Sequence, residues 1–152
     1  MPTTVPTREL VARALRDVQA PPVVPPWRHR VLPPSARQAL AALGWWQDPT
    51  PQPPSRHLAH VLAVLRHYGW TQSQDVTLTG RMCVRGAQAM LQRAGHVTPT
   101  ARARAVEYME SVLRAAGVHM AFFAWNDLPG QDFPTVEKLL TAAAYQARKE
   151  GE

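Results

Sequence analysis

Apolar residues recur every three or four positions through the last two thirds of the chain, the spacing that places side chains along one face of a helix. In the clearest stretch the apolar positions are Leu58, Val61, Leu62, Leu65 and Tyr68. A glycine follows three of these stretches, as expected where a helix ends on a residue in the left-handed conformation. The pattern predicts four core helices, at about residues 55–69, 82–94 and 99–116, and from Pro134 onward.

Little else in this part of the chain favours strands. Segment 75–79 contains Val76, Thr77 and Leu78, and it is the one stretch that we interpret as a strand. It forms one short hairpin at most. The sequence therefore predicts a mainly all-α protein, a small bundle of about four core helices.

Proline divides the chain into two parts. Twelve of the fifteen prolines lie at or before residue 54, and each fixes φ and removes a backbone donor. Between the prolines there is room for two short helices, one capped by Thr7 that extends to about residue 18, and one capped by Ser35 that ends at Gly44. We predict a Pro-rich N-terminal arm over residues 1–54 and a helical globular domain over residues 55–152.

Length and composition narrow the class of protein. With 152 residues, of which 45% are hydrophobic, the chain is long enough to bury one core. No apolar run reaches the roughly 20 residues that a membrane span requires, and the N-terminus lacks the basic and apolar regions of a secretory signal. Cys83 is the only cysteine, which excludes an internal disulfide. We expect a soluble cytoplasmic protein with no membrane partner and no cofactor.

Positive charge is concentrated before residue 99. The formal net charge is +6; residues 1–54 carry six Arg against three acidic residues, and residues 55–98 carry five against one. Residues 99–152 carry six basic and seven acidic residues. Such an asymmetry is expected for a protein with an anionic partner, of which nucleic acid is the commonest. The alternative is a compositional bias, because Arg outnumbers Lys fifteen to two.

One predicted helix face carries side chains suited to reading DNA. Arg81, Arg85, Gln88 and Gln92 are separated by four, three and four residues, so they form one stripe opposite the apolar positions. Arg pairs with guanine and Gln with adenine in the major groove, which makes the stripe a candidate nucleic-acid contact. A solvated helix face has the same pattern, and that interpretation stays open.

Residues 94–104 resemble the turn and the start of the recognition helix in helix-turn-helix proteins. A glycine lies in the turn, and Arg102 and Arg104 fall in the first turns of the second helix, from which these proteins contact bases. Thr98 followed by Pro99 is also an ordinary helix start. Arg102 and Arg104 are therefore supporting candidates for the contact.

Three short motifs differ from the Ala, Leu, Arg and Pro background. They are Gly69-Trp70-Thr71-Gln72, Gly80-Arg81-Met82-Cys83-Val84-Arg85-Gly86-Ala87 and Trp125-Asn126-Asp127-Leu128-Pro129-Gly130. In this order they resemble the pattern W-x-Q, G-x-x-C-x-x-G-A and W-N-D-x-P-G of a family of short uncharacterised proteins of high-GC (actinobacterial) bacteria and their phages. The resemblance covers roughly the last two thirds of the chain, and no established activity comes with it.

We interpret these motifs as a scaffold. The Asn-Asp-Leu-Pro-Gly run has the chemistry of a turn, the two tryptophans are expected in the core, and the glycine of the second motif allows another helix to approach closely. On this interpretation the function lies on other surfaces. The motif residues concerned are Trp70, Gln72, Cys83, Gly86, Trp125, Asn126 and Asp127.

Cysteine catalysis is the enzymatic alternative. A helix N-terminus favours the thiolate form of a nearby cysteine, and Gln72, Cys83, His119 and Asn126 follow the chain order of papain-like enzymes. The helical wheel instead places Cys83 on the apolar side of its predicted helix, as a small hydrophobic residue. We therefore assign no catalytic residue.

Three histidines lie along one edge of the first core helix. His57 and His60 are about one turn apart, whereas His67 lies about 10 Å farther along the axis. The three cannot share one ion, so we predict no metal site.

The leading hypothesis is a nonenzymatic binding or regulatory protein, of the accessory kind that phages and mobile elements carry, in contact with nucleic acid. The first alternative is a protein partner held by the arm, with Trp27, Trp45 and Trp46 as aromatic anchors. The second alternative is a cysteine-dependent hydrolase centred on Cys83.

Overall fold

The computed structural model describes residues 24, 25, 28 and 31–152. No strand forms in this part of the chain, where Trp70 and Val76 make only isolated bridges with Met82, so the protein is a small all-α bundle as predicted. None of the described helices is both long enough and apolar enough to cross a bilayer. The helices are α3 (Pro34–Ala42), α4 (Pro54–Tyr68), α5 (Val84–Arg93), α6 (Pro99–Ala115), α7 (Phe122–Asn126) and α8 (Phe133–Lys149).

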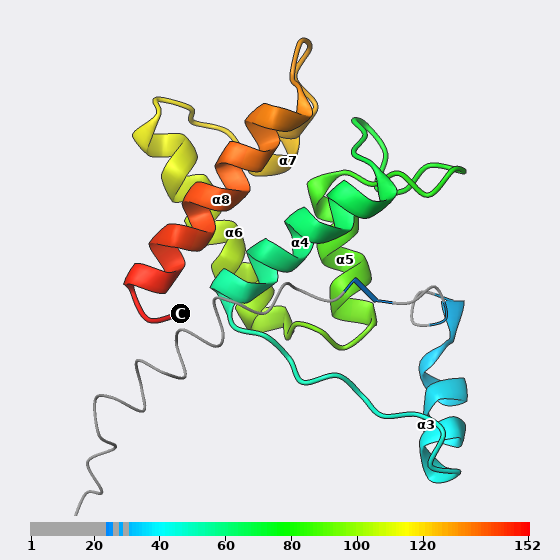
Figure 1. Ribbon diagram of the computed structural model, residues 1–152. Coiled ribbons are helices and arrows are strands. Elements are labelled where there is room, and N and C mark those ends of the chain that lie inside the picture. The colour runs from blue at the N-terminus through cyan, green and yellow to red at the C-terminus, as the bar shows by residue number, and fades with distance from the viewer. Residues whose placement is uncertain (1–23, 26–27, 29–30) are drawn as a thin grey trace, which may run out of the picture.

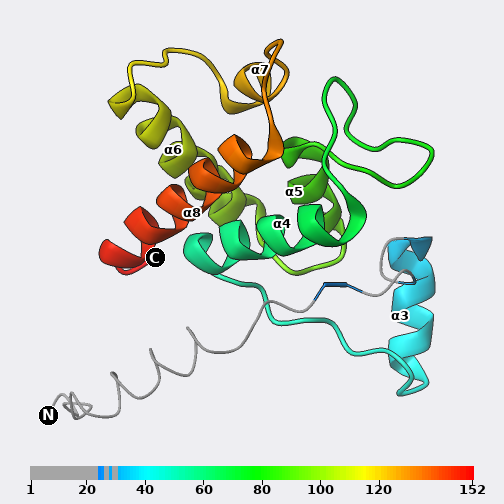
Figure 2. The ribbon, with the colours of Figure 1, turned by 45° about the horizontal axis from the view of Figure 1, so that its top comes forward.

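Helices α4 and α8 lie side by side and antiparallel, and α6 packs against both (Figure 1). α5 packs against α4 on the side away from α8, and it also contacts α6 (Figure 2). Burial of each large apolar side chain between these helices contributes roughly 2 kcal/mol. The fully buried residues of this core include Leu58, Leu65, Leu91, Met109 and Leu140.

Proline rather than serine begins two of the helices. α3 starts at Pro34 and α4 at Pro54, each one residue before the serine expected outside the helix as its cap. Proline suits the first helical position because its φ is already fixed and it has no N–H to leave unsatisfied. Ser35 and Ser55 therefore lie in the first turns, and the predictions that they cap these helices are wrong.

Helix α7 was not predicted from the sequence. Its five residues are too few to display a helical repeat of apolar positions. Phe122, Trp125 and Asn126 are buried, whereas Phe123 points outward and is 44% exposed. This short helix carries the first residues of the third motif into the end of the bundle.

One helix of the N-terminal arm stands away from the bundle, whereas two other parts of the arm contact the bundle. α3 has no buried residue, and it stands apart from the other helices in both views (Figures 1 and 2). Farther along, the Gln52 N–H donates to the carbonyl of His96 at 2.9 Å, and near residue 25 the Tyr68 hydroxyl donates to the carbonyl of Pro25 at 3.3 Å. The helix predicted at residues 7–18 lies outside the described residues, and the boundary between arm and domain stays a prediction.

Candidate functional site

The three motifs meet at one end of the bundle, where the loop between α4 and α5 lies beside α7 (Figure 1). The indole N–H of Trp70 donates to the side-chain oxygen of Asn126 at 2.8 Å. The side-chain amide of Gln72 donates to the backbone carbonyls of Asn126 at 3.0 Å and Leu128 at 2.8 Å. Because Asn126 is buried, the two bonds to it satisfy polar groups that bulk water does not reach.

Asp127 adds a second link between the same segments. Its carboxylate accepts the backbone N–H of Ser73 and the side-chain N–H of Asn126, each at 2.8 Å. Ser73 has a φ of 64°, which is uncommon for a residue other than glycine, and the bond from its N–H helps to hold that conformation. Gly130, in the turn that follows, has a φ of 80°, as the second central position of a Pro-Gly turn requires.

Gly86 lets the same loop reach α5. A Cβ added at Gly86 would lie 1.8 Å from the backbone oxygen of Asp75, so only glycine fits this contact. The close approach is made by a loop residue, not by a helix as expected. Cys83 is the N-cap of α5 and its sulfur accepts the N–H of Gly86 at 3.4 Å, so the cysteine lies just before the helix rather than within it.

The aromatic motif residues pack into the bundle. Trp125 is 8% exposed and belongs to the core. Trp70 packs against the core and stacks on Phe133, with 6.4 Å between the ring centroids. Every motif residue therefore has partners within this chain, which favours their interpretation as a scaffold.

The loop, α4 to α7 and all but the last three residues of α8 fall within one family match. Residues 49–146, more than half of the chain, match the sequence model of DUF6197, a family of unknown function. The chain belongs to the DUF6197 family. No curated protein and no solved structure matches this chain.

In this DUF6197 protein the predicted stripe of Arg and Gln does not form one surface. Gln88 is fully buried between α5 and α4, where its amide nitrogen lies 3.4 Å from Nε2 of His57. Arg81 is exposed, but it lies in the loop before the helix. The prediction that Gln88 contacts nucleic acid is wrong, because α4 covers that face of α5.

Arg104 forms ion pairs with carboxylates of its own chain. Its guanidinium donates to Glu107 at 2.6 Å and Glu152 at 2.9 Å, and it lies 3.5 Å from Glu150. The bond to Glu152, followed by that to Glu107, raises the pKa of Arg104 above its usual value. Its charge is neutralised within the protein, so we remove Arg104 from the candidate contact.

Three other guanidiniums gather where α5 meets the start of α6. Arg85 and Arg93 lie on α5, and Arg102, on α6, donates to the side-chain oxygen of Gln92 at 3.1 Å. Burial lowers the pKa of Arg102, and the charges of Arg93 and Arg85 lower it further, against the opposing effect of Asp75. The charges of both α5 arginines and of Asp75 therefore act on Arg102. We call Arg85, Gln92, Arg93 and Arg102 the α5–α6 cationic surface.

Asp75 is the acidic neighbour of this surface. Its carboxylate accepts from Arg85 at 2.8 Å, and both side chains are 50% exposed. Arg93 and Arg102 form no ion pair with a carboxylate of the described residues. The sequence did not single out Arg93 because the stripe ended at Gln92, although Arg93 follows Arg85 by about two helical turns.

The thiol of Cys83 is protected from reaction. It is 6% exposed, and burial raises its pKa, an effect to which the nearby Asp75 carboxylate adds. A buried thiol that holds its proton is a poor nucleophile. His119 is exposed and lines a hollow with Arg114 and Met120. These features disfavour a hydrolase centred on Cys83.

Buried histidines lie between α4 and its neighbours. The pKa of His57 is lowered from 6.5 to about 3, first by burial and then by the charges of His60 and Arg102. The ring of His60 meets that of His96 edge to face, with 4.9 Å between the centroids. Within the described part of the chain, no group of three His, Cys, Asp or Glu side chains is placed to bind a metal ion.

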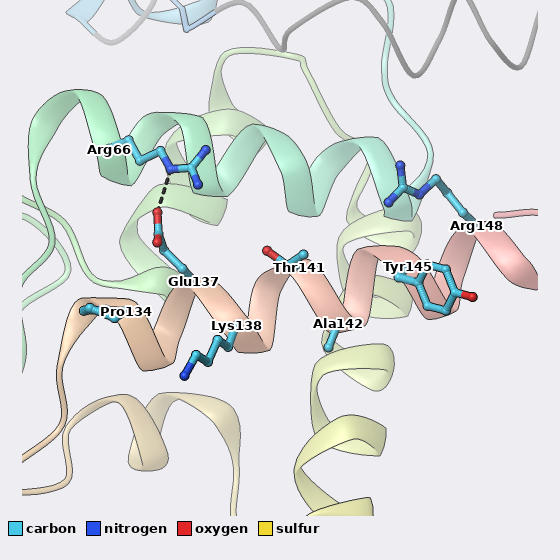
Figure 3. A pocket seen from close by; sticks show the side chains of 8 residues that line it. All are labelled: Arg66, Pro134, Glu137, Lys138, Thr141, Ala142, Tyr145 and Arg148. Carbon is cyan, nitrogen blue, oxygen red and sulfur yellow. Dashed lines mark hydrogen bonds and ion pairs between the residues drawn. The ribbon is translucent and has the colours of Figure 1, made fainter.

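A groove of about 570 Å³ runs between α4 and α8 on the outside of the bundle (Figure 3). Arg66 and Glu137, which form an ion pair at 2.6 Å, lie at one end, and Arg148 lies at the other. Lys138 and Tyr145 also line the groove. Seven of the eight lining residues lie on α8, so the available signal in the sequence was the basic and polar face of the last helix; only Arg66 comes from a helix far away in the chain.

The three tryptophans proposed as anchors differ in their surroundings. Trp45 is 76% exposed. Trp46 is buried, and its indole N–H donates to Asp48 at 2.9 Å, so the prediction that Trp46 anchors a partner is wrong. Trp27 lies outside the described residues.

Proposed function

We propose that this protein is a nonenzymatic nucleic-acid-binding protein of a regulatory or accessory kind, and that the α5–α6 cationic surface contacts the phosphate backbone. The observation that carries the proposal is that exposed or half-buried guanidiniums lie on two neighbouring helices, and that two of them, Arg93 and Arg102, have no carboxylate partner among the described residues. Gathering like charges disfavours the folded state, whereas a polyanion bound there would relieve the repulsion and release its counterions.

The residues of this surface have distinct parts in the proposed contact. Arg85 and Arg93 are exposed, and a guanidinium can donate two parallel hydrogen bonds to a phosphate. Arg102 is half-buried and is oriented by the oxygen of Gln92, which leaves the amide nitrogen of Gln92 to donate to the partner. Arg81, exposed in the preceding loop, stays a peripheral candidate.

Compositional bias alone accounts poorly for this arrangement. Such a bias explains how many arginines the chain has, but it does not explain why three of them converge from two helices. Other arginines of the same chain, such as Arg66 and Arg104, have carboxylate partners. Arg85 is paired with Asp75, whereas Arg93 and Arg102 are paired with no described carboxylate, and this contrast supports a partner for Arg93 and Arg102.

The test is the fluorescence anisotropy of a labelled random DNA duplex titrated with the protein across a salt series. We expect log affinity to fall linearly with log salt, and the slope to lose about 0.9 for each phosphate contact removed in Arg85→Gln, Arg93→Gln and Arg102→Gln. Arg114→Gln removes an exposed charge at the other end of α6 and serves as the matched control. Absence of binding at low salt, or an equal loss in the control, would contradict the proposal.

A protein partner held by the arm is the second candidate function. The exposure of Trp45, at 76%, and of Leu43, at 63%, supports it, because aromatic side chains of this kind commonly anchor interfaces. We expect Trp45→Ala to leave the duplex affinity unchanged and to reduce recovery of partner proteins from a host extract. Recovery equal to that of the wild-type protein would argue against an anchor at this position.

A further inference from the structure

The groove between α4 and α8 gathers positive charge in a part of the chain that is otherwise acidic. Three basic side chains line it, and because Glu137 pairs with Arg66, the charges of Lys138 and Arg148 remain available. Lys138 and Arg148 lie within residues 99–152, which as a whole carry six basic and seven acidic side chains, so their presence together does not follow from an overall excess of Arg. The groove is complementary to an anionic ligand.

An aromatic ring lies among these charges. Tyr145 is 60% exposed, and the Nζ of Lys149 lies 5.8 Å from its ring centroid. Arg148 and Tyr145 line the same end of the groove, as Figure 3 shows. Exposed aromatic rings beside cations are the feature on which single-stranded nucleic acids stack their bases.

The length of the groove suits a short single strand. From Glu137, which holds Arg66, to Arg148, α8 rises about 16 Å at ~1.5 Å per residue. A stacked strand rises ~3.4 Å per nucleotide, so the groove spans a few nucleotides. Lys138 and Arg148, about 15 Å apart along α8, can then contact phosphates while one base lies on Tyr145.

An acidic peptide fits the groove less well. Seven of its eight lining residues belong to α8 and the eighth, Arg66, to α4, and the backbone groups of a helix bond internally and offer no edge to an extended peptide. A helical peptide needs a row of apolar anchor sites, whereas the apolar lining is confined to Pro134, Ala142 and the ring of Tyr145.

We infer that the α4–α8 groove binds single-stranded nucleic acid, with a base stacked on Tyr145 and phosphates held by Arg148 and Lys138. The inference rests on the proposed function and adds to it a second surface, specific for unpaired strands. The α5–α6 cationic surface contacts the backbone of a duplex, and the groove takes an overhang or a melted segment.

The experiment compares a labelled oligothymidylate with a labelled random duplex in the full chain. Tyr145→Leu keeps apolar area but removes the aromatic face, and we expect it to weaken binding of the single strand about tenfold while duplex affinity stays unchanged. Tyr145→Phe keeps the face and should bind as the wild type does. Arg148→Gln should lower the salt slope for the single strand by about 0.7, and Arg114→Gln should not.

The outcomes separate the two proposals. Duplex binding without single-strand binding, or equal single-strand affinity in the wild type and Tyr145→Leu, overturns the groove assignment and leaves the proposed function intact. Binding of neither probe overturns both. A labelled oligoglutamate that binds the wild type but not Arg148→Gln, with no binding of oligothymidylate, would assign the groove to an acidic protein instead. If the triple variant Arg85→Gln, Arg93→Gln, Arg102→Gln loses duplex binding but keeps single-strand binding, the result supports two separate surfaces.

Discussion

Arg102 and Arg104 lie two residues apart at the start of α6, yet their surroundings are opposite. Arg104 has three carboxylate partners, Glu107, Glu150 and Glu152. Arg102 has no carboxylate partner among the described residues and lies within the electrostatic reach of two other guanidiniums. The first arginine links the C-terminal end of α8 to α6, and the second belongs to a surface whose charge is only partly compensated, by Asp75.

The difference shows what makes an arginine a candidate ligand for phosphate. Position in the sequence does not distinguish the two residues, and both fit the start of a recognition helix. The tertiary structure distinguishes them, because it brings the acidic end of the chain to one and the basic helix α5 to the other. A candidate ligand for phosphate is therefore an arginine whose charge is not neutralised by a carboxylate of the folded chain.

The largest effect that we expect comes from the contact that holds Asp75 beside the cationic surface. Gly86→Ala would place a Cβ 1.8 Å from the backbone oxygen of Asp75, and we expect a loss of more than about 4 kcal/mol in the free energy of unfolding. Gly95→Ala is the control, because its Cβ would come no closer than 3.5 Å and only its φ of +85° is strained. Urea denaturation measures both, and equal losses would show that the Asp75 contact is not the cause.

The next largest effect tests whether a charge of the α5–α6 cationic surface helps to lower the pKa of the buried His57. The pKa of His57 falls from 6.5 to about 3 on folding, so the unfolded chain binds the additional proton and stability decreases as the pH falls through this range. Between about pH 7 and pH 4 we expect His57 to account for a loss of about 3 kcal/mol.

Denaturation at the two pH values checks this prediction. His57→Gln should flatten the pH dependence; an unchanged slope would contradict the assignment to His57. Because the charge of Arg102 contributes to the lowered pKa, Arg102→Gln should reduce the acid loss slightly. Arg104→Gln should leave it as in the wild type.

A smaller effect should follow from removing the acidic neighbour of the surface. Asp75→Asn deletes the carboxylate that pairs with Arg85, so we expect duplex affinity to rise about threefold and the gain to diminish at high salt. Asp48→Asn, a change of the same charge in the arm, is the control. A decrease in affinity for Asp75→Asn would mean that the ion pair positions Arg85 for binding instead of competing with the ligand.

The smallest effect that we expect is a change in melting temperature that differs in sign between variants of Arg104 and Arg102. At low salt Arg104→Gln should lower the melting temperature, because it removes the partner of three carboxylates. Arg102→Gln should leave the melting temperature unchanged or raise it, because it removes a half-buried charge and its repulsion from Arg93 and Arg85, which together outweigh the attraction of Asp75. A lower melting temperature in both variants would show that the surface is not strained by its own charge.

Much of the fold could be predicted from the sequence, for identifiable reasons. The long helices show the repeat of apolar positions over several turns. The motifs around Trp70 and Asn126 are rich in residue types, such as Trp, Gly, Asn and Pro, that occur in few structural settings. The serine caps were wrong because proline at the preceding position begins a helix equally well. α7 was missed because five residues carry no periodic signal.

The candidate site was less predictable. Gln88 is polar and lies opposite most apolar positions of α5, so the sequence placed it at the surface. In the structure α4 covers it and His57 supplies a polar neighbour. Which helix covers a given face, and which carboxylates reach a given arginine, are decided by tertiary packing and cannot be read from spacing within one helix.

The most direct test of the account is duplex binding by Arg102→Gln and Arg104→Gln, measured in parallel across a salt series. The test asks whether binding depends on the charge that an arginine keeps available after folding or on its position in the sequence. We predict that Arg102→Gln weakens binding and lowers the salt slope by about 0.9, while Arg104→Gln binds with the wild-type affinity and slope. Equal losses in the two variants, or a loss confined to Arg104→Gln, would contradict it.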